Sequence, residues 1–259
     1  MNIVLVHGVL GFGRLPSLVG LPIVSYFNGV AAHLGKRHRV VEPSLNPIGS
    51  VAERGDQLAA EIERLHLGSG EKVHIIAHSM GGLDARHAIG KVGDRVAGLA
   101  TIGTPHRGSP VADAIINRTG PLVDRLPSWL ADAFRGTALR DLTTPVATAA
   151  MEATRDAPGV RYVDVAGDAS RGSTTLALFH VAAAVGGIAG EVNDGVVTRS
   201  SALVPGHRHL PDWPVDHAGE IGWGYEFPLP ASWPLAGLWP PARAHFARYD
   251  ALVRALSGA

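Results

Sequence analysis

A serine lies where a predicted strand changes into a predicted helix. Residues 72–77 form a short apolar run that is typical of a buried strand, and residues 79–91 have helical composition. Ser79 stands between them in the stretch AHSMGG. So sharp a turn forces its central residue into a strained backbone and exposes the hydroxyl, provided that small residues stand two positions before and after it. Ala77 and Gly81 meet that condition, so Ser79 is a candidate nucleophile.

The turn also has a simpler interpretation. A strand-to-helix connection with an N-cap serine has the same residue pattern, and Ala77 departs from the glycine that usually precedes such a nucleophile. A nucleophilic serine also needs an oxyanion hole. One backbone N–H donor of that hole follows the serine, and a second comes from a loop at the carboxyl end of a neighbouring strand. The stretch HGVLGF, residues 7–12, ends the first predicted strand, and Gly8 allows a close turn there. A plain strand-ending turn is the alternative for this stretch.

A nucleophilic serine needs a general base, and the base needs a carboxylate that orients it. In α/β-hydrolases these residues follow in the order serine, acid, histidine. Asp194 in NDGVV and His217 in DHAGEI occur in that order, each in a predicted loop. The order therefore favours Asp194 as the acid and His217 as the base.

Other residues compete for these two roles. The tripeptide around Asp194 is also an ordinary turn former. Asp168, after a predicted strand, and Asp216, beside the histidine, are rival acids. The rival bases are His207 and His209, a pair that we interpret as part of a loop or strand and not as metal ligands.

Predicted strands and helices alternate over the first hundred residues, which favours a parallel sheet covered by helices on both faces. Residues 104–158 carry no clear strand. We therefore predict one α/β domain over residues 1–259, with a mostly parallel sheet and a helical cap or lid insertion over residues 109–158. The expected strands are 2–6, 39–42, 72–77, 96–102, 160–166 and 202–204, and the expected helices include 23–34, 50–66, 79–91 and 242–256.

Composition excludes several classes of protein. Lys+Arg and Asp+Glu are both 23, so a formal net charge of +0 offers no strong field for nucleic acid. The chain has no cysteine, which excludes disulfides and thiolate chemistry. Its longest apolar stretch, residues 176–190, contains His180 and is too short for a bilayer. We expect a cytoplasmic protein if Met1 is the native start, and a secreted one if a leader was removed.

Five stretches together resemble bacterial triacylglycerol lipases of the Pseudomonas and Burkholderia type. They are HGVLGF, AHSMGGLDARH, TIGTPHRGS, NDGVV and DHAGEI, in this order, and residues 141–167 are also similar to that family. The likeness runs from about residue 2 to about residue 222. It implies an α/β-hydrolase fold and a triad of Ser79, Asp194 and His217.

The resemblance also implies how the oxyanion is bound and how the site is covered. Backbone N–H groups of Val9 and Met80 would form the oxyanion hole, and the insertion after Ser109 would act as a lid. One feature of the family is missing. Those lipases typically hold a calcium ion with two aspartates, but Gly219 occupies one of these positions and residues 169–190 contain no acid. We therefore expect no metal and no cofactor, and expect the aromatic segment 222–239 to pack over the His217 loop.

The expected activity is that of a hydrolase of lipid metabolism, a serine carboxylesterase or lipase that cleaves apolar acyl esters through an acyl-enzyme. The expected partners are a small-molecule or lipid ester and a transient lipid interface, without nucleic acid or an integral membrane segment. An acyltransferase, a thioesterase or a polyester-degrading hydrolase could use the same triad, and a non-catalytic binding protein is a remote alternative. The candidate substrate-binding residues are Leu10, Phe12, Trp129, Leu130 and Trp223.

Overall fold

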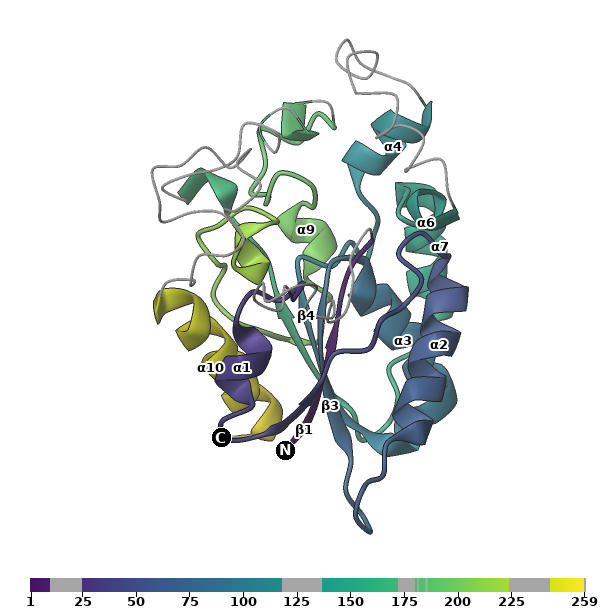
Figure 1. The fold of residues 1–259 in the computed structure, drawn as a ribbon. Coiled ribbons are helices and arrows are strands. Elements are labelled where there is room, and N and C mark those ends of the chain that lie inside the picture. Colours follow the sequence, from purple (N-terminus) through teal and green to yellow (C-terminus); the bar gives the residue numbers. More distant parts are fainter. Residues whose placement is uncertain are drawn as a thin grey trace, which may run out of the picture.

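A parallel β-sheet forms the centre of the molecule (Figure 1). The computed structural model describes residues 1–9, 25–117, 137–171, 180, 182–184, 186–223 and 243–258. Within these residues the sheet has six strands in the order β2-β1-β3-β4-β5-β6, and each neighbouring pair is parallel. The strands are β1 (Asn2–Val6), β2 (Arg39–Val41), β3 (Val73–His78), β4 (Val96–Ile102), β5 (Arg161–Val165) and β6 (Arg208–His209). The sequence-based prediction of a mostly parallel α/β sheet is confirmed.

Helices cover both faces of this sheet (Figure 1). The pair α2 and α3 lies against one face, and α1 and α10 lie against the other. These four helices are α1 (Val30–Leu34), α2 (Val51–Arg64), α3 (Met80–Val92) and α10 (Arg243–Ser257). The other described elements are α4 (Pro110–Asn117), α6 (Thr137–Asp141), α7 (Thr144–Ala153), α9 (Arg199–Ala202), and the 3-10 turns η1 (Gly93–Arg95), η3 (Ala169–Arg171) and η4 (Gly219–Ile221). No helix among the described residues is long and apolar enough to cross a bilayer.

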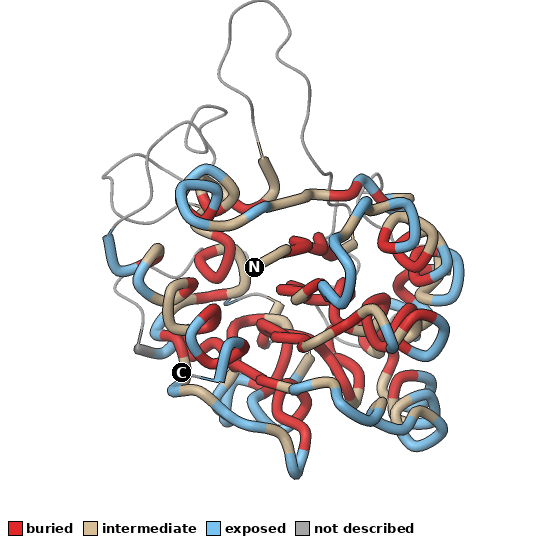
Figure 2. The backbone as a smooth tube through the Cα atoms, turned by 90° about the horizontal axis from the view of Figure 1, so that it is seen from below, coloured by how far each residue is buried: buried red, intermediate tan, exposed pale blue. Residues whose placement is uncertain are grey.

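Side-chain alternation along the strands divides the core into two layers. Ile3 and Leu5 of β1 pack in the cluster that contains α1 and α10, whereas Val4 and Val6 pack in the cluster that contains α2 and α3. All four side chains are buried because a central parallel strand has helices on both faces. Figure 2 shows the buried residues gathered along the centre of the molecule. The two layers leave the carboxyl ends of the strands as the edge where loops can build a site.

Two element predictions differ from the structure. The helix expected over residues 23–34 begins only at Val30, because Gly29 precedes it with a left-handed φ of 70°. The strand expected at 202–204 is wrong. Residues 199–202 form α9 instead, capped by the Thr198 hydroxyl, which accepts a hydrogen bond from the Ser201 N–H. Local capping there outweighs the strand propensity of the apolar residues that follow.

The described part of the segment 109–158 packs over the start of α3. Met80 at the helix start shares an apolar cluster with Ala112 of α4 and Leu139 of α6. Hydrogen bonds join the two sides of this segment, from the Ser109 N–H to the Leu142 carbonyl at 2.9 Å and from the Thr144 N–H to the side chain of Asp113 at 2.8 Å. Its helices therefore rest beside the serine turn, and residues 118–136 lie outside the described residues.

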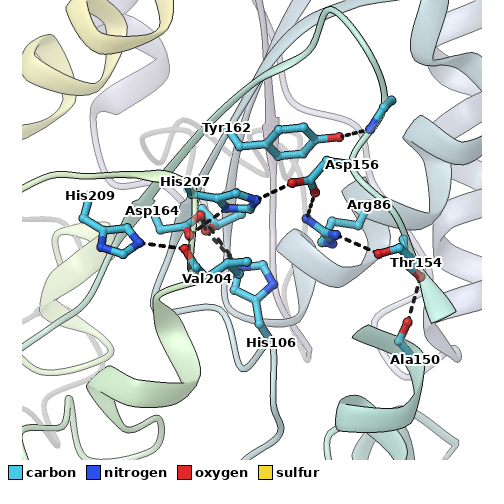
Figure 3. A network of polar contacts seen from close by, with 12 residues as sticks. Arg86, His106, Ala150, Thr154, Asp156, Tyr162, Asp164, Val204, His207 and His209 are labelled. Atoms are coloured by element: carbon cyan, nitrogen blue, oxygen red, sulfur yellow. Dashed lines mark hydrogen bonds and ion pairs between the residues drawn. The ribbon is translucent and has the colours of Figure 1, made fainter. Parts of the chain in front are cut away.

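A polar network with Asp164 buried at one end and Asp156 exposed at the other holds the outer edge of the sheet, where β6 pairs with β5 (Figure 3). Asp164 of β5 accepts a hydrogen bond from the Val204 N–H at 2.9 Å and contacts Nδ1 of His207 at 2.8 Å. Nε2 of His207 contacts Asp156 at 2.9 Å, and Asp156 pairs with Arg86 of α3 at 2.8 Å. The network therefore ties β5, the segment before β6 and α3 together.

We expect His207→Gln to weaken the fold more at low pH than at high pH. Burial alone would lower the pKa of His207, but hydrogen bonds and charges from Asp164 and Asp156 raise it above 6.5. A group with a raised folded pKa contributes stability that is complete below its unfolded pKa and is lost as the pH rises through the folded value. The free energy of unfolding, measured in urea at about pH 6 and about pH 9, checks the expectation.

His209→Gln is the matched control, because the His209 ring bonds to the Val204 carbonyl and not to a carboxylate. We expect its effect on the free energy of unfolding to be the same at both pH values. An equal effect of His207→Gln at both pH values would contradict the prediction.

Candidate active site

The Ser79 turn has the strained backbone that the sequence predicts. Ser79 has φ 56° and ψ −134°, and it is the one non-glycine with positive φ among the described residues. Such a conformation persists only where the surrounding structure determines it. The Ser79 N–H donates to the Ile102 carbonyl at the end of β4 at 2.9 Å, and α3 begins at the next residue. This turn therefore joins the carboxyl end of β3 directly to a helix N-terminus, which favours a developing negative charge beside the serine.

Two glycines after Ser79 allow the close contacts that this turn requires. A Cβ atom on Gly81 would lie 2.6 Å from the Val6 carbonyl oxygen, and one on Gly82 would lie 2.2 Å from the Thr104 hydroxyl. Both positions therefore require glycine. Ala77, on the other flank, is fully buried and pairs with Val6 in the sheet, so the structure accommodates its methyl group.

Asp194 and His217 form a hydrogen-bonded pair near this turn. Nδ1 of His217 lies 2.7 Å from Oδ2 of Asp194, and the His217 N–H donates to the Asp194 carbonyl at 2.9 Å. The other carboxylate oxygen of Asp194 accepts hydrogen bonds from the Val196 and Val197 N–H groups at 2.8 and 2.7 Å. Four hydrogen bonds thus hold the carboxylate and the imidazole in one orientation. The His217 ring lies 4.4 Å, centroid to centroid, from the ring of His78, which precedes Ser79 in the chain.

The TIGTPHRGS stretch holds the loop that carries Asp194. The Ser109 hydroxyl donates to the Val196 carbonyl at 2.6 Å, and the Ser201 hydroxyl donates to the Gly108 carbonyl at 2.7 Å. The Ser201 oxygen also accepts a hydrogen bond from the Arg107 N–H at 3.1 Å. The stretch therefore anchors the acid loop although it contributes no member of the triad.

Glu220 is a second carboxylate that the sequence reasoning missed. Its Oε2 lies 2.9 Å from Nε2 of His78 and 3.3 Å from Nδ1 of His217, and its side chain is fully buried. It fits because Gly103 and Gly167 have no side chains: Cβ atoms there would lie 2.2 and 2.6 Å from its carboxylate oxygens. The sequence signal that could have identified it is its position three residues after His217. The 3-10 turn η4 brings its carboxylate back to the imidazole.

Two carboxylates beside one imidazole change the proton affinities of the site. Burial alone would lower the pKa of His217, but Asp194 and Glu220 raise it above its ordinary value of 6.5. Burial and the Asp194 charge raise the pKa of Glu220. Burial lowers the pKa of His78 well below 6.5, so this ring is neutral. The site therefore combines one neutral histidine with one that attracts a proton.

The first loop, which carries Val9, is held by a buried ion pair. Arg54 of α2 pairs with Asp84 of α3 at 2.7 Å, and both side chains are fully buried. The same guanidinium donates to the His7 carbonyl at 2.6 Å. The His7 ring accepts a hydrogen bond from the Leu45 N–H at 3.0 Å and contacts the Gly8 carbonyl through its other nitrogen at 2.9 Å. Burial lowers the pKa of His7 to about 4, so the ring is neutral in this arrangement.

The rival acids and bases have other partners. Asp168 accepts hydrogen bonds from the N–H and the hydroxyl of Ser170 at 3.1 and 2.5 Å, and Asp216 accepts one from the Gly219 N–H at 2.8 Å. His207 and His209 belong to the network at the β5–β6 edge (Figure 3). The structure therefore brings Asp194 and His217 together and gives these rivals structural contacts. The catalytic roles themselves stay predictions.

Most of the predicted substrate-binding residues fall outside the described residues, namely Leu10, Phe12, Trp129 and Leu130. Trp223 is half-buried and packs against the apolar core, and its indole N–H donates to the Tyr26 carbonyl at 2.7 Å. These contacts show how Trp223 is held, and its contact with substrate stays a prediction. Of the segment 222–239, which was expected to cover the His217 loop, residues 224–239 also lie outside the described part of the chain.

One group of side chains among the described residues could present metal ligands, and it lies within the same site. His78, His217 and Glu220 have donor atoms within 4.8 Å of one another. Hydrogen bonding between these three side chains already accounts for their close approach. At Gly219, where the resembling lipases have an aspartate, the backbone N–H bonds to Asp216. The expected loss of the calcium site stays a prediction.

Sequence comparison finds similarity to triacylglycerol lipases, although no family model matches the chain. A triacylglycerol lipase of Vibrio cholerae is 36% identical over 115 residues, which is 44% of this chain and 35% of that protein. One from Burkholderia plantarii is 32% identical over 167 residues, which is 55% of this chain and 44% of that protein. The chain thus spans half or less of the length of these relatives. The resemblance that the motifs predict is confirmed.

Solved structures with the same fold include lipases and esterases. A Bacillus licheniformis lipase in its mature form has a TM-score of 0.65 and 26% identity, covering 85% of this chain and 86% of that one. A metagenomic carboxyl esterase has a TM-score of 0.74 and 17% identity, covering 100% of this chain and 76% of that one. The chain has an α/β-hydrolase fold, as predicted.

We expect Arg54→Met to destabilise the protein by about 3–5 kcal/mol, because removing one member of a buried ion pair leaves the other charge without a partner. The free energy of unfolding in urea measures the effect. Arg64→Met is the matched control on the same helix, since Arg64 pairs with Glu61 at the exposed surface and contributes little. Equal stability of the two variants would contradict the prediction.

We expect Glu220→Gln to lower the pKa of His217. Two carboxylates raise that pKa, and the amide removes one negative charge while keeping the shape. The titration midpoint of His217, followed by NMR, should move to lower pH by about one unit. Glu152→Gln, at an exposed position on α7, serves as the control and should leave the midpoint in place. An unmoved midpoint in Glu220→Gln would show that Asp194 alone determines this pKa.

Proposed function

We propose that this protein is a serine carboxylic-ester hydrolase that cleaves apolar acyl esters through an acyl-enzyme on Ser79. The observation that carries the proposal is the hydrogen bond of 2.7 Å between Asp194 and His217 at the edge of the sheet where the strained Ser79 turn lies. Similarity to proteins called triacylglycerol lipases supports it. The site residues carry this inference, because the fold alone hosts many activities.

The first half of the proposed reaction forms the acyl-enzyme. Ser79 Oγ attacks the ester carbonyl carbon while Nε2 of His217 takes the hydroxyl proton. Asp194, on the opposite ring nitrogen, keeps Nε2 available and stabilises the imidazolium that forms. The carbonyl oxygen becomes an oxyanion that accepts hydrogen bonds from the Val9 and Met80 N–H groups. Each such donor contributes about 3 kcal/mol to the stability of the transition state.

The second half releases both products. The tetrahedral intermediate collapses, the bond to the alcohol oxygen breaks, and His217 gives its proton to the leaving alcohol. Water then attacks the acyl carbon while His217 takes one of its protons. The second collapse breaks the bond to Ser79 Oγ, returns the proton to that oxygen, and releases the carboxylic acid.

An apolar acyl ester is the proposed substrate, and the segment 109–158 is the proposed lid. The described helices of that segment contact Met80 at the start of α3, so they are next to the proposed oxyanion donor. Ile116 of α4 and Val146 of α7 are exposed apolar side chains on this segment. A transient contact of the lid with a lipid surface is part of the proposal.

We expect Ser79→Ala to lose about 10⁴-fold or more of the hydrolytic activity, because the covalent step needs the hydroxyl. The measurement is hydrolysis of p-nitrophenyl esters from acetate to palmitate, with both proteins side by side. Ser257→Ala, which removes an exposed serine at the end of α10, is the control and should retain full activity.

The ester series also tests the substrate class. A maximum at medium or long chains supports the apolar acyl pocket, and a maximum at acetate contradicts it. Equal activity of Ser79→Ala and the wild-type protein overturns the acyl-enzyme. Absence of hydrolysis of every ester, with and without detergent, overturns the proposed hydrolase.

A further inference from the structure

His78 has a hydrogen-bond partner on each ring nitrogen. Nε2 lies 2.9 Å from Oε2 of Glu220, and Nδ1 lies 2.7 Å from the hydroxyl oxygen of Tyr26. The ring is buried and neutral, so it carries a single N–H. Oε2 of Glu220 also lies 3.3 Å from Nδ1 of His217, the nitrogen that bonds to Asp194, so this oxygen faces two ring nitrogens and accepts hydrogen bonds. The proton of His78 is therefore on Nε2, and Nδ1 is left as an acceptor. The Tyr26 hydroxyl therefore donates to His78.

The direction of this hydrogen bond turns the lone pairs of the Tyr26 oxygen away from His78. The oxygen lies against the first loop, 2.8 Å from the position that a Cβ atom would take on Gly8. That same position is 2.8 Å from Cβ and 3.2 Å from Oγ of Ser79. Gly8 is thus held between a fixed hydroxyl and the nucleophile, and the next residue is Val9.

The Tyr26 backbone is tied to the loop that carries His217. The Trp223 indole donates to the Tyr26 carbonyl at 2.7 Å. Asn28 donates through its backbone N–H to the Ile221 carbonyl and through its side chain to the Gly222 carbonyl, both at 2.9 Å. Tyr26 therefore connects the segment after His217 with the first loop. Its backbone is fixed by Trp223 and its hydroxyl by His78.

We propose that Tyr26 is a positioning residue of the active site, whose hydroxyl, oriented by His78, sets the position of the Gly8–Val9 loop relative to Ser79. The proposal rests on the proposed function, because the Gly8–Val9 loop matters for catalysis only if the Val9 N–H is part of the oxyanion hole. Tyr26 acts through the backbone and does not touch the reacting atoms. It should therefore affect the chemical step more than substrate binding.

Tyr26→Phe is the variant that isolates the hydroxyl. The ring stays available for its contacts with Phe27 and His7, whose centroids lie 5.3 and 5.7 Å away. Tyr162→Phe is the matched control, since the Tyr162 hydroxyl accepts one hydrogen bond from the Ala157 N–H beside the β5 network (Figure 3). Each variant loses one tyrosine hydroxyl with its hydrogen bonding, and only one of them faces the proposed oxyanion loop.

The first measurement compares kcat and KM for p-nitrophenyl butyrate in wild-type protein and both variants. We expect Tyr26→Phe to lower kcat about tenfold with little change in KM, and Tyr162→Phe to leave both constants nearly unchanged. The rate at which a p-nitrophenyl phosphonate modifies Ser79 should fall by a similar factor in Tyr26→Phe, because that reaction also places charge on the oxyanion. Thermal unfolding of both variants records any general loss of structure.

The second measurement is independent of activity. In protein labelled with ¹⁵N-histidine, His78 should have its proton on Nε2, and the Nδ1 resonance should shift in Tyr26→Phe and not in Tyr162→Phe. A proton on Nδ1 in the wild-type protein overturns the proposed orientation. An unchanged kcat in Tyr26→Phe overturns the positioning role while leaving the hydrolase intact, and equal kcat losses in both variants do the same. Absence of esterase activity in the wild-type protein overturns the proposed function itself, which distinguishes that outcome from a failure of the Tyr26 proposal alone.

Discussion

The close approach of backbone segments at the carboxyl ends of β1, β3 and β4 is the constraint on which the site depends. Ser79 can hold a left-handed φ only because the Ile102 carbonyl binds its N–H and because two glycines let α3 start against the sheet. Gly8 allows the first loop to reach the same point. Any side chain at these glycines would separate the serine from the loops around it, so the geometry of the turn determines where every other group can stand.

Buried charged side chains with polar partners are the second feature that shapes the described part of the molecule. Arg54 and Asp84 join α2 to α3 and hold the His7 carbonyl, so the pair acts on the fold and on the first loop together. Glu220 lies beneath both His78 and His217, where two glycines leave room for its carboxylate. The cost of burying these charges is offset only while all partners are present, which makes the site sensitive to the loss of any one of them.

Hydrogen bonds outside the site fix the segments that carry the candidate catalytic residues. The network of Asp164 and His207 fixes the edge strand β6, after which the chain runs toward His217. The Ser109 hydroxyl fixes the loop of Asp194. The lipase-like motif that contains Ser109 therefore holds a loop through its hydrogen bonds, and a motif match does not by itself assign a catalytic role.

The sequence by itself determined the parallel α/β architecture, because short apolar strands that alternate with helices bury both faces of a sheet. It also determined the turn at Ser79, since small residues at fixed spacing around a serine are a local requirement, and it favoured Asp194 and His217 through their order in the chain. Local signals failed at residues 202–204, where a strand was predicted. A threonine cap there produced α9, which ends at Ala202.

Only the tertiary structure decided which distant side chains share the site. Asp194 pairs with His217 across 23 residues, and Glu220 meets His78 across 142. Tyr26 reaches His78 from a segment where we expected a plain helix. Such contacts depend on how several loops converge at one edge of the sheet, and neither periodicity nor spacing along the chain contains that information.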